Sequence, residues 1–116
     1  MIEVNNACEA FEKLLREQLA RIAAMNDEKT DFATKKVVTI GVIDGDGIGP
    51  IITTHATKVL EKLLADEIAA GSIVIKYIEG LTIENRMACN QPIPSDVLAE
   101  IKSCDVLLKG PTTTPH

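Results

Sequence analysis

Six residues with a distinctive glycine spacing are the most informative part of the sequence. They directly follow an apolar run and read Gly45-Asp46-Gly47-Ile48-Gly49-Pro50. Glycine adopts positive φ and lets another backbone or a ligand come close. A helix that begins at Pro50 would point its free N–H groups and its positive dipole end into the same crevice. This combination is typical of a site for a nucleotide or another anion, although a purely structural tight turn has the same spacing.

Two phosphate-binding fingerprints do not fit this loop. If Gly45 and Gly47 are the first two glycines of a GxGxxG pattern, the third falls on Pro50. The pattern GxxxxGK[ST] is also absent, because no Lys-Ser or Lys-Thr pair follows. Asp44 and Asp46 could in principle bind a cation, but we expect both to make hydrogen bonds within the turn.

A second group of polar residues lies near the end of the sequence. Lys109 ends an apolar run, and Thr112, Thr113 and Thr114 follow it after a Gly-Pro pair. Hydroxyls at a strand end can hydrogen-bond the ribose and amide of a cofactor, and an ammonium can pair with a substrate carboxylate. The alternative is that the threonines simply terminate a strand.

The other residues that could do chemistry give weaker signals. His55 falls on a predicted helix, where we expect it to be solvated, and Tyr77 falls in a predicted strand, where we expect it in the core. The three cysteines, Cys8, Cys89 and Cys104, lack CxxC spacing and predict neither a zinc site nor a disulfide framework. No residue of the chain is predicted to be catalytic or to bind a metal.

The elements that position these residues follow from the hydrophobic period. Residues 6–25 predict an amphipathic helix, with Asn6 as its cap and Glu9 completing a capping box. A polar linker, residues 26–36, comes next. The β-branched run 37–43 then predicts a strand that is buried on both faces.

The rest of the chain alternates between helices and strands. A helix from Pro50 to a stop at Gly71 is followed by a strand over residues 73–78. Residues 79–94 are expected to be irregular because of two prolines near their end. Ser95 is expected to cap a short helix that ends at Ser103, and residues 105–109 predict a third strand.

This order of elements predicts an α/β fold. A helix followed by β-α-β-α-β indicates a partial, doubly wound and mostly parallel sheet covered by helices. We expect two parts, residues 1–35 as an N-terminal helix and linker, and residues 36–116 as part of a larger domain. The N-terminal helix either packs on its own domain or docks on a partner subunit.

Composition excludes several classes of protein. A net charge of −5 and an aromatic content of 3% argue against nucleic-acid binding through phosphate contacts or base stacking. The longest nearly apolar run is too short to cross a bilayer, and the N-terminus lacks the apolar run of a secretory signal. We therefore expect a cytoplasmic protein without a membrane partner.

Taken together, the two polar segments resemble the isocitrate/isopropylmalate dehydrogenase family. Residues 43–50 are similar to the family's opening strand and loop, which usually reads I-P-G-D-G-I-G-P-E; Asp44 stands in place of the proline and Ile51 in place of the glutamate. Residues 104–115 resemble the K-G-P-x-T-T-P segment of isocitrate-type members, and Gln91–Pro94 also fits that type. Isopropylmalate-type members more often read L-G-A-x-G-x-P. The similarity covers residues 36–115.

The resemblance implies roles for particular residues. Ile48 is expected to pack near the adenine of NAD or NADP, and Thr112, Thr113 and Thr114 to line the nicotinamide side. Thr114 and Lys109 are expected to bind the substrate, a 2-hydroxy acid such as isocitrate, which is an intermediate of the tricarboxylic acid cycle. The ligands of the family's Mg²⁺ or Mn²⁺ are expected outside this sequence.

The resemblance also implies that the chain is not active alone. We expect a small subunit, or N-terminal piece, of an oligomeric decarboxylating dehydrogenase. Its complementary chain is expected to carry the residues that bind the substrate carboxylates, the proton-transfer residues and the metal ligands. One alternative is a non-catalytic regulatory subunit that binds a nucleotide. Another is an inactive truncated fragment, which would expose unpaired strand edges and self-associate.

Overall fold

The computed structural model describes residues 3–115 of the chain. The chain forms two compact units, of which the first ends at Asp31 and the second begins at Phe32. This division lies inside the polar linker predicted from composition. The candidate site residues, Ile48, Lys109 and Thr112–Thr114, all belong to the second unit.

Between residues 3 and 31, the described part of the first unit, the chain forms the helix α1 (Val4–Ala23). It confirms the predicted amphipathic helix but begins before the predicted start, so the capping box at Asn6 is wrong. The amide of Ala7 donates to the carbonyl of Glu3 at 3.2 Å, and Glu3 occupies the N-cap without a side-chain capping bond. Asn6 therefore has helical backbone, and a residue inside the first turn cannot cap it.

The second unit is built on three parallel strands, β1 (Val38–Ile43), β2 (Ile73–Tyr77) and β3 (Val106–Lys109), in the order β2-β1-β3. The α/β fold with a parallel sheet is thus confirmed. Val42 pairs with both Tyr77 and Leu108, so the carboxyl ends of all three strands reach the same edge. The central strand is buried over its last four residues, as its apolar run predicted.

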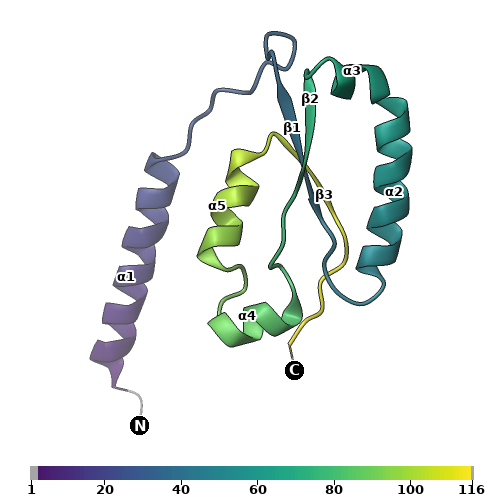
Figure 1. Cartoon of the computed structure of the whole chain (residues 1–116). Helices are drawn as coiled ribbons and strands as arrows, with labels where there is room; N and C mark the ends of the chain where they lie inside the picture. Colours follow the sequence, from purple (N-terminus) through teal and green to yellow (C-terminus); the bar gives the residue numbers. More distant parts are fainter. Residues whose placement is uncertain (1–2, 116) are drawn as a thin grey trace. The chain divides into compact units, whose positions relative to one another are not determined.

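Helices cover both faces of this sheet. Figure 1 shows α2 (Gly49–Leu63) on one side of the strands and α5 (Ser95–Ser103) on the other. The core on the α5 side is formed by Ile43, Ile78, Leu81 and Val97. The helix expected to run unbroken to Gly71 is interrupted at Leu64 and continues as α3 (Ala65–Ala69). Gly71, at φ +78°, ends it as predicted.

A helix also forms in the segment that was expected to be irregular. α4 (Ile83–Cys89) begins at Thr82, whose hydroxyl accepts a hydrogen bond from the amide of Asn85 at 3.3 Å. It ends at Asn90, whose φ of +50° is left-handed. The prediction failed because Pro92 and Pro94 prevent helix only near themselves, beyond the end of α4.

Two further predictions about single residues are wrong. Ser95 is the first residue of α5 and does not cap it, since the N-cap position is held by Pro94. Tyr77 is not in the core: it is 58% exposed, because β2 is an edge strand within the described residues and its side chain lies beside α2. His55, in contrast, is exposed on α2 as expected. Within residues 3–115, no helix is both long enough and apolar enough to cross a membrane.

The cap of α4 gives a direct test of this fold. Replacing Thr82 by alanine (Thr82→Ala) removes the hydroxyl that satisfies the Asn85 amide, and it should lower the free energy of unfolding by about 1 kcal/mol. Ser95→Ala is the matched control and should change it by less than about 0.5 kcal/mol, because Ser95 lies inside its helix. Urea denaturation followed by circular dichroism measures both. A larger loss from Ser95→Ala would contradict the described caps.

Candidate carboxyl-edge site

The loops that follow β1 and β3 pack backbone against backbone. The amide of Asp46 donates to the carbonyl of Pro111 at 2.8 Å, and the amide of Gly110 donates to the carbonyl of Ile43 at 2.7 Å. A Cβ atom placed on Gly45 would lie 2.1 Å from the Pro111 carbonyl oxygen, and one on Gly110 would lie 2.1 Å from that of Asp44. Glycine is therefore required at both positions by the close approach of the two loops.

The carboxylate of Asp46 joins three loops at this edge. One oxygen accepts from the amide of Ile83 at 2.7 Å, and the other from the amide of Thr113 at 2.9 Å. The guanidinium of Arg86 lies 3.8 Å away, and Asp46 is only 9% exposed. These interactions connect the loop after β1 to the start of α4 and to the loop after β3. The expected hydrogen bonding within the turn is thus wrong for the Asp46 side chain, whose two oxygens accept from Ile83 and Thr113 in other segments.

Arg86 strengthens the same connection. Its Nη1 donates to the carbonyl of Thr113 at 2.9 Å, and its Nε donates to the carbonyl of Pro92 at 2.9 Å. The side chain is 13% exposed, so this charge is largely removed from water and held by oxygen partners. Arg86 was not among the residues predicted to be functional, because it lies in the segment that was expected to be irregular. We name the network of Asp46, Arg86, Ile83 and Thr113 the carboxyl-edge clamp.

The carboxyl-edge clamp lowers the pKa of Asp46. The largest causes are the hydrogen bonds from the amides of Thr113 and Ile83, and the positive charges of Arg86 and Lys109 add to them, while partial burial acts in the opposite direction. Donors that point at a carboxylate stabilise its charged form. Asp46 is therefore an anionic hydrogen-bond acceptor at neutral pH.

The structure brings the predicted site residues to one edge of the sheet. Ile48 lies at the N-cap of α2 and is 62% exposed. Thr113 is tied to Asp46, two residues before Ile48, so the glycine loop and the threonine segment adjoin. Thr112 is half-buried, whereas Thr113 and Thr114 are exposed. Whether these residues bind a cofactor or substrate stays a prediction.

Lys109 is held by its own neighbours. Its Nζ donates to the carbonyl of Gly110 at 3.0 Å and to the hydroxyl of Thr112 at 3.3 Å. These bonds turn the ammonium toward the threonine segment at the end of β3. Lys109, which is predicted to bind the substrate, is thus hydrogen-bonded to Thr112, which is predicted to bind the cofactor.

The turn before α2 is internally bonded. The amide of Gly49 donates to the carbonyl of Asp46 at 2.9 Å, and the hydroxyl of Thr53 lies 2.5 Å from a carboxylate oxygen of Asp44. The amides of Gly47 and Ile48 make no hydrogen bond to another residue between 3 and 115. Within that same range, no three His, Cys, Asp or Glu side chains are grouped so that they could hold a metal ion.

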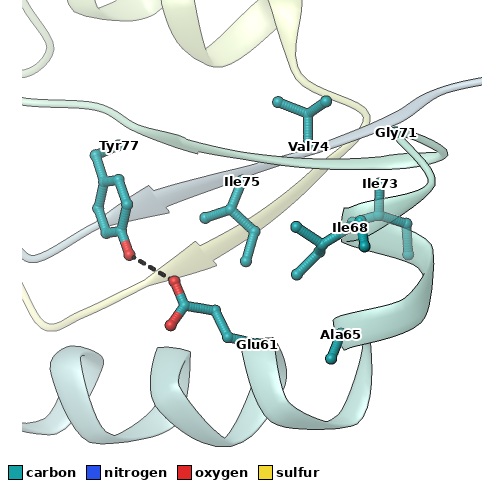
Figure 2. A pocket seen from close by; sticks show the side chains of 9 residues that line it. Glu61, Ala65, Ile68, Gly71, Ile73, Val74, Ile75 and Tyr77 are labelled. Atoms are coloured by element: carbon teal, nitrogen blue, oxygen red, sulfur yellow. Dashed lines mark hydrogen bonds between the residues drawn. The ribbon is translucent and has the colours of Figure 1, made fainter.

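Several hollows lie around the sheet, and they differ in their lining. One of about 400 Å³ adjoins the glycine loop between the ends of β1 and β2, and its lining includes Asp44, Gly45 and Thr82. Another of about 600 Å³ lies between α2, α3 and β2 (Figure 2), away from the carboxyl-edge clamp. In that hollow Tyr77 donates to Glu61 at 3.3 Å, and partial desolvation together with the Glu61 carboxylate raises the pKa of Tyr77. Its mainly apolar lining offers little chemistry, so we place the candidate site at the clamp.

Gly45 and Gly47 both have positive φ, but only Gly45 lies close to another loop. Substitutions at these two positions therefore distinguish the cost of that steric contact from the cost of backbone strain. Gly47, at φ +58°, has open space around an added Cβ, whereas Gly45, at φ +74°, has none. Gly47→Ala should lower the free energy of unfolding by about 1–2 kcal/mol, the cost of left-handed backbone alone. Gly45→Ala should cost at least about 3 kcal/mol, because the loop after β3 must also move. Equal losses in chemical denaturation would contradict the described contact with Pro111.

The carboxyl-edge clamp also predicts a pH dependence. Because folding lowers the pKa of Asp46 from its ordinary 3.8, the carboxylate contributes stability above that pH, and the contribution is lost as the pH falls through the folded value. The difference in free energy of unfolding between the wild type and Asp46→Asn should therefore be constant near neutral pH and shrink in acid. Denaturation curves over a pH series measure it. A difference that does not change with pH would contradict the clamp.

Carboxyl NMR titration of Arg86→Met separates the contributions to this pKa. The variant should raise the pKa of Asp46 but leave it below 3.8, because the two amide donors are larger causes than the guanidinium. A pKa that returns fully to the ordinary value would show that Arg86 dominates, contrary to the described hydrogen bonds.

Comparison with known proteins agrees with the family resemblance of the glycine loop and the threonine segment. The family described as isocitrate/isopropylmalate dehydrogenase matches residues 39–116. The 3-isopropylmalate dehydrogenase of Sulfurisphaera tokodaii is 36% identical over 74 residues, which are 63% of this chain and 21% of that protein. The NADP isocitrate dehydrogenase of Caldococcus noboribetus is 36% identical over 77 residues, which are 66% of this chain and 18% of that protein.

The chain thus spans about a fifth of the length of these two relatives. No solved structure matches it significantly. The family match covers well over half of the chain and includes β1 from Thr39 onward, the glycine loop, β2, β3 and the threonine segment. The chain belongs to the isocitrate/isopropylmalate dehydrogenase family.

Proposed function

We propose that this chain forms one wall of the cofactor and substrate site of an isocitrate-type decarboxylating dehydrogenase, and that a complementary polypeptide forms the rest. The observation that carries the proposal is the hydrogen bond between Asp46 and Thr113, which joins the glycine loop to the threonine segment. In a chain of this family, the two segments then flank one crevice beyond the carboxyl ends of a parallel sheet. Such crevices are where open α/β sheets bind their ligands.

The exposed groups at this edge fit a dinucleotide. Ile48 presents an apolar surface on which an adenine can pack, and the amides of Gly47 and Ile48, just before α2, donate to no other residue between 3 and 115. Thr113 and Thr114 present exposed hydroxyls that can bond ribose and amide groups. Family members generally use NAD or NADP, and when bound, the nicotinamide supplies the acceptor for the substrate's hydride.

Lys109 supports isocitrate as the substrate. The two relatives act on different 2-hydroxy acids and are equally similar to this chain, so the comparison does not choose between them. Lys109, with the Thr113-Thr114 pair, matches the isocitrate-type pattern. Its ammonium, held beside Thr112, can pair with a substrate carboxylate and so orient the hydroxyl-bearing carbon toward the cofactor.

In our proposal, the residues that bind the metal ion of the reaction belong to the complementary polypeptide. Residues 3–115 offer no group of three His, Cys, Asp or Glu side chains that could hold Mg²⁺ or Mn²⁺. Decarboxylation after hydride transfer needs such an ion in the same site as the residues that bind the substrate carboxylates. We therefore propose that the ligands, the arginines and the proton-transfer residues come from the complementary polypeptide.

Reconstitution tests this proposal. The chain is mixed with a polypeptide that carries the remainder of an isocitrate-type dehydrogenase, and the formation of reduced NAD or NADP is followed with isocitrate and Mn²⁺. We expect activity in the mixture and none in either component. Lys109→Met should lower kcat/KM for isocitrate about 10- to 100-fold, as expected for the loss of a charged hydrogen bond.

Lys102→Met is the matched control, because Lys102 is an exposed lysine on α5 and belongs to no part of the proposed site. It should leave kcat/KM unchanged. Activity of the chain alone would contradict the need for a partner. An inactive mixture, combined with binding of adenine nucleotides by the isolated chain in calorimetry, would favour a non-catalytic regulatory subunit.

A further inference from the structure

Two adjoining hollows lie beside β2, and one is apolar whereas the other is polar. Figure 2 shows the larger one, of about 600 Å³, with Ile73 toward one end and the hydrogen-bonded pair Tyr77 and Glu61 toward the other. The smaller one, of about 170 Å³, shares Glu61 and Tyr77 with it and is otherwise bordered by Asp44, Thr54, Thr57 and Lys58. An apolar surface that ends in a polar pocket suits a ligand with an apolar body and a polar head.

Two carboxylates without an ion-pair partner border the polar hollow. Asp44 accepts from the hydroxyl of Thr53, and Glu61 accepts from that of Tyr77, but neither carboxylate forms a salt bridge within residues 3–115. Partial desolvation, and then the charges of Glu61 and Asp44, raise the pKa of Tyr77, so both charges act at this hydroxyl. Lys58 offsets only one of them. The polar hollow therefore favours a cation.

The hydroxyl of Thr57 is an independent sign of a ligand in the polar hollow. Thr57 is only 3% exposed, and its hydroxyl has no hydrogen-bond partner among residues 3–115. In contrast, Thr53 and Thr54 of the same helix donate to the carbonyls of Gly49 and Pro50 at 2.8 and 2.6 Å, which is the usual bond of a helical threonine. Because buried hydroxyls are nearly always bonded, that of Thr57 calls for a partner in the hollow that it borders.

From these observations we infer that the two hollows bind a small primary amine with an apolar body. A protonated amine has three N–H donors, which match the acceptors offered by Asp44, Glu61 and Thr57. The apolar body packs between α3 and β2, against Ile68, Ile73 and Ile75. Asp44 stands where the family loop usually has proline, so this site belongs to the present chain. It uses none of the residues of the proposed function and does not rest on that function.

An NMR titration of the whole ¹⁵N-labelled chain with hexylamine, which is protonated at neutral pH, tests the inference. We expect saturable shifts of amides in α2, α3 and β2. The compounds 1-hexanol and hexanoate have the same apolar body with a neutral or a negative head, and they should bind at least about 10-fold more weakly. Equal binding of 1-hexanol would overturn the inference, because the hollow would then be only an apolar surface. So would a lack of saturable shifts, or shifts in other elements.

Substitutions around the polar hollow test which groups hold the ammonium. Thr57→Val keeps the shape of the side chain but removes the hydroxyl, and Glu61→Gln removes one charge; each should weaken hexylamine binding about 3- to 10-fold. Lys58→Met removes a competing positive charge and should strengthen it. Glu67→Gln is the matched control for Glu61→Gln, because Glu67 is an exposed carboxylate on α3 that borders neither hollow.

The control should bind hexylamine as the wild type does, and the same spectra show that each variant is folded. An unchanged affinity in Thr57→Val or Glu61→Gln would overturn the assigned site. A loss in Glu67→Gln as large as that in Glu61→Gln would overturn it too, because the amine would then respond only to the overall negative charge of the chain.

Discussion

The arrangement of the carboxyl edge depends on one carboxylate. Asp46 accepts hydrogen bonds from the amides of Ile83 and Thr113, and its own amide donates to Pro111. Without it, the loop after β1 and the start of α4 would lose the described bond between them, and both amides would need other acceptors. The predicted cofactor residues Ile48 and Thr113 belong to the segments that this carboxylate joins, so their relative position follows from it.

A second aspartate plays a similar part at the opposite ends of the strands. Asp105 accepts from Lys35 and from the amide of Thr39, and these two donors lower its pKa. β3 is short, and only one of its four residues is even half-buried. Apolar burial alone therefore holds this strand weakly. Polar contacts before and after it fix β3 against β1, which in turn fixes where Lys109 and the threonines lie.

The sequence predicted those features of the fold that depend on residues close to one another in the chain. The strand 38–43 and the stop at Gly71 were found because hydrophobic period and glycine act within a few residues. α4 was missed because its cap is a single threonine and its end is an asparagine, in a segment dominated by nearby prolines. The pairing of Asp46 with Arg86 could not be predicted, since no local signal shows which distant segment a side chain meets.

The carboxyl-edge clamp consists mostly of bonds to main-chain atoms, and this has a consequence for sequence variation. Every residue except proline offers the same N–H, so positions 83 and 113 can change identity without losing the bonds to Asp46. The acceptor has no such freedom, because glutamate is longer and asparagine turns one acceptor oxygen into a donor. One residue thus carries the constraint for three loops, and the segments around it can diverge toward different ligands while their spacing is kept.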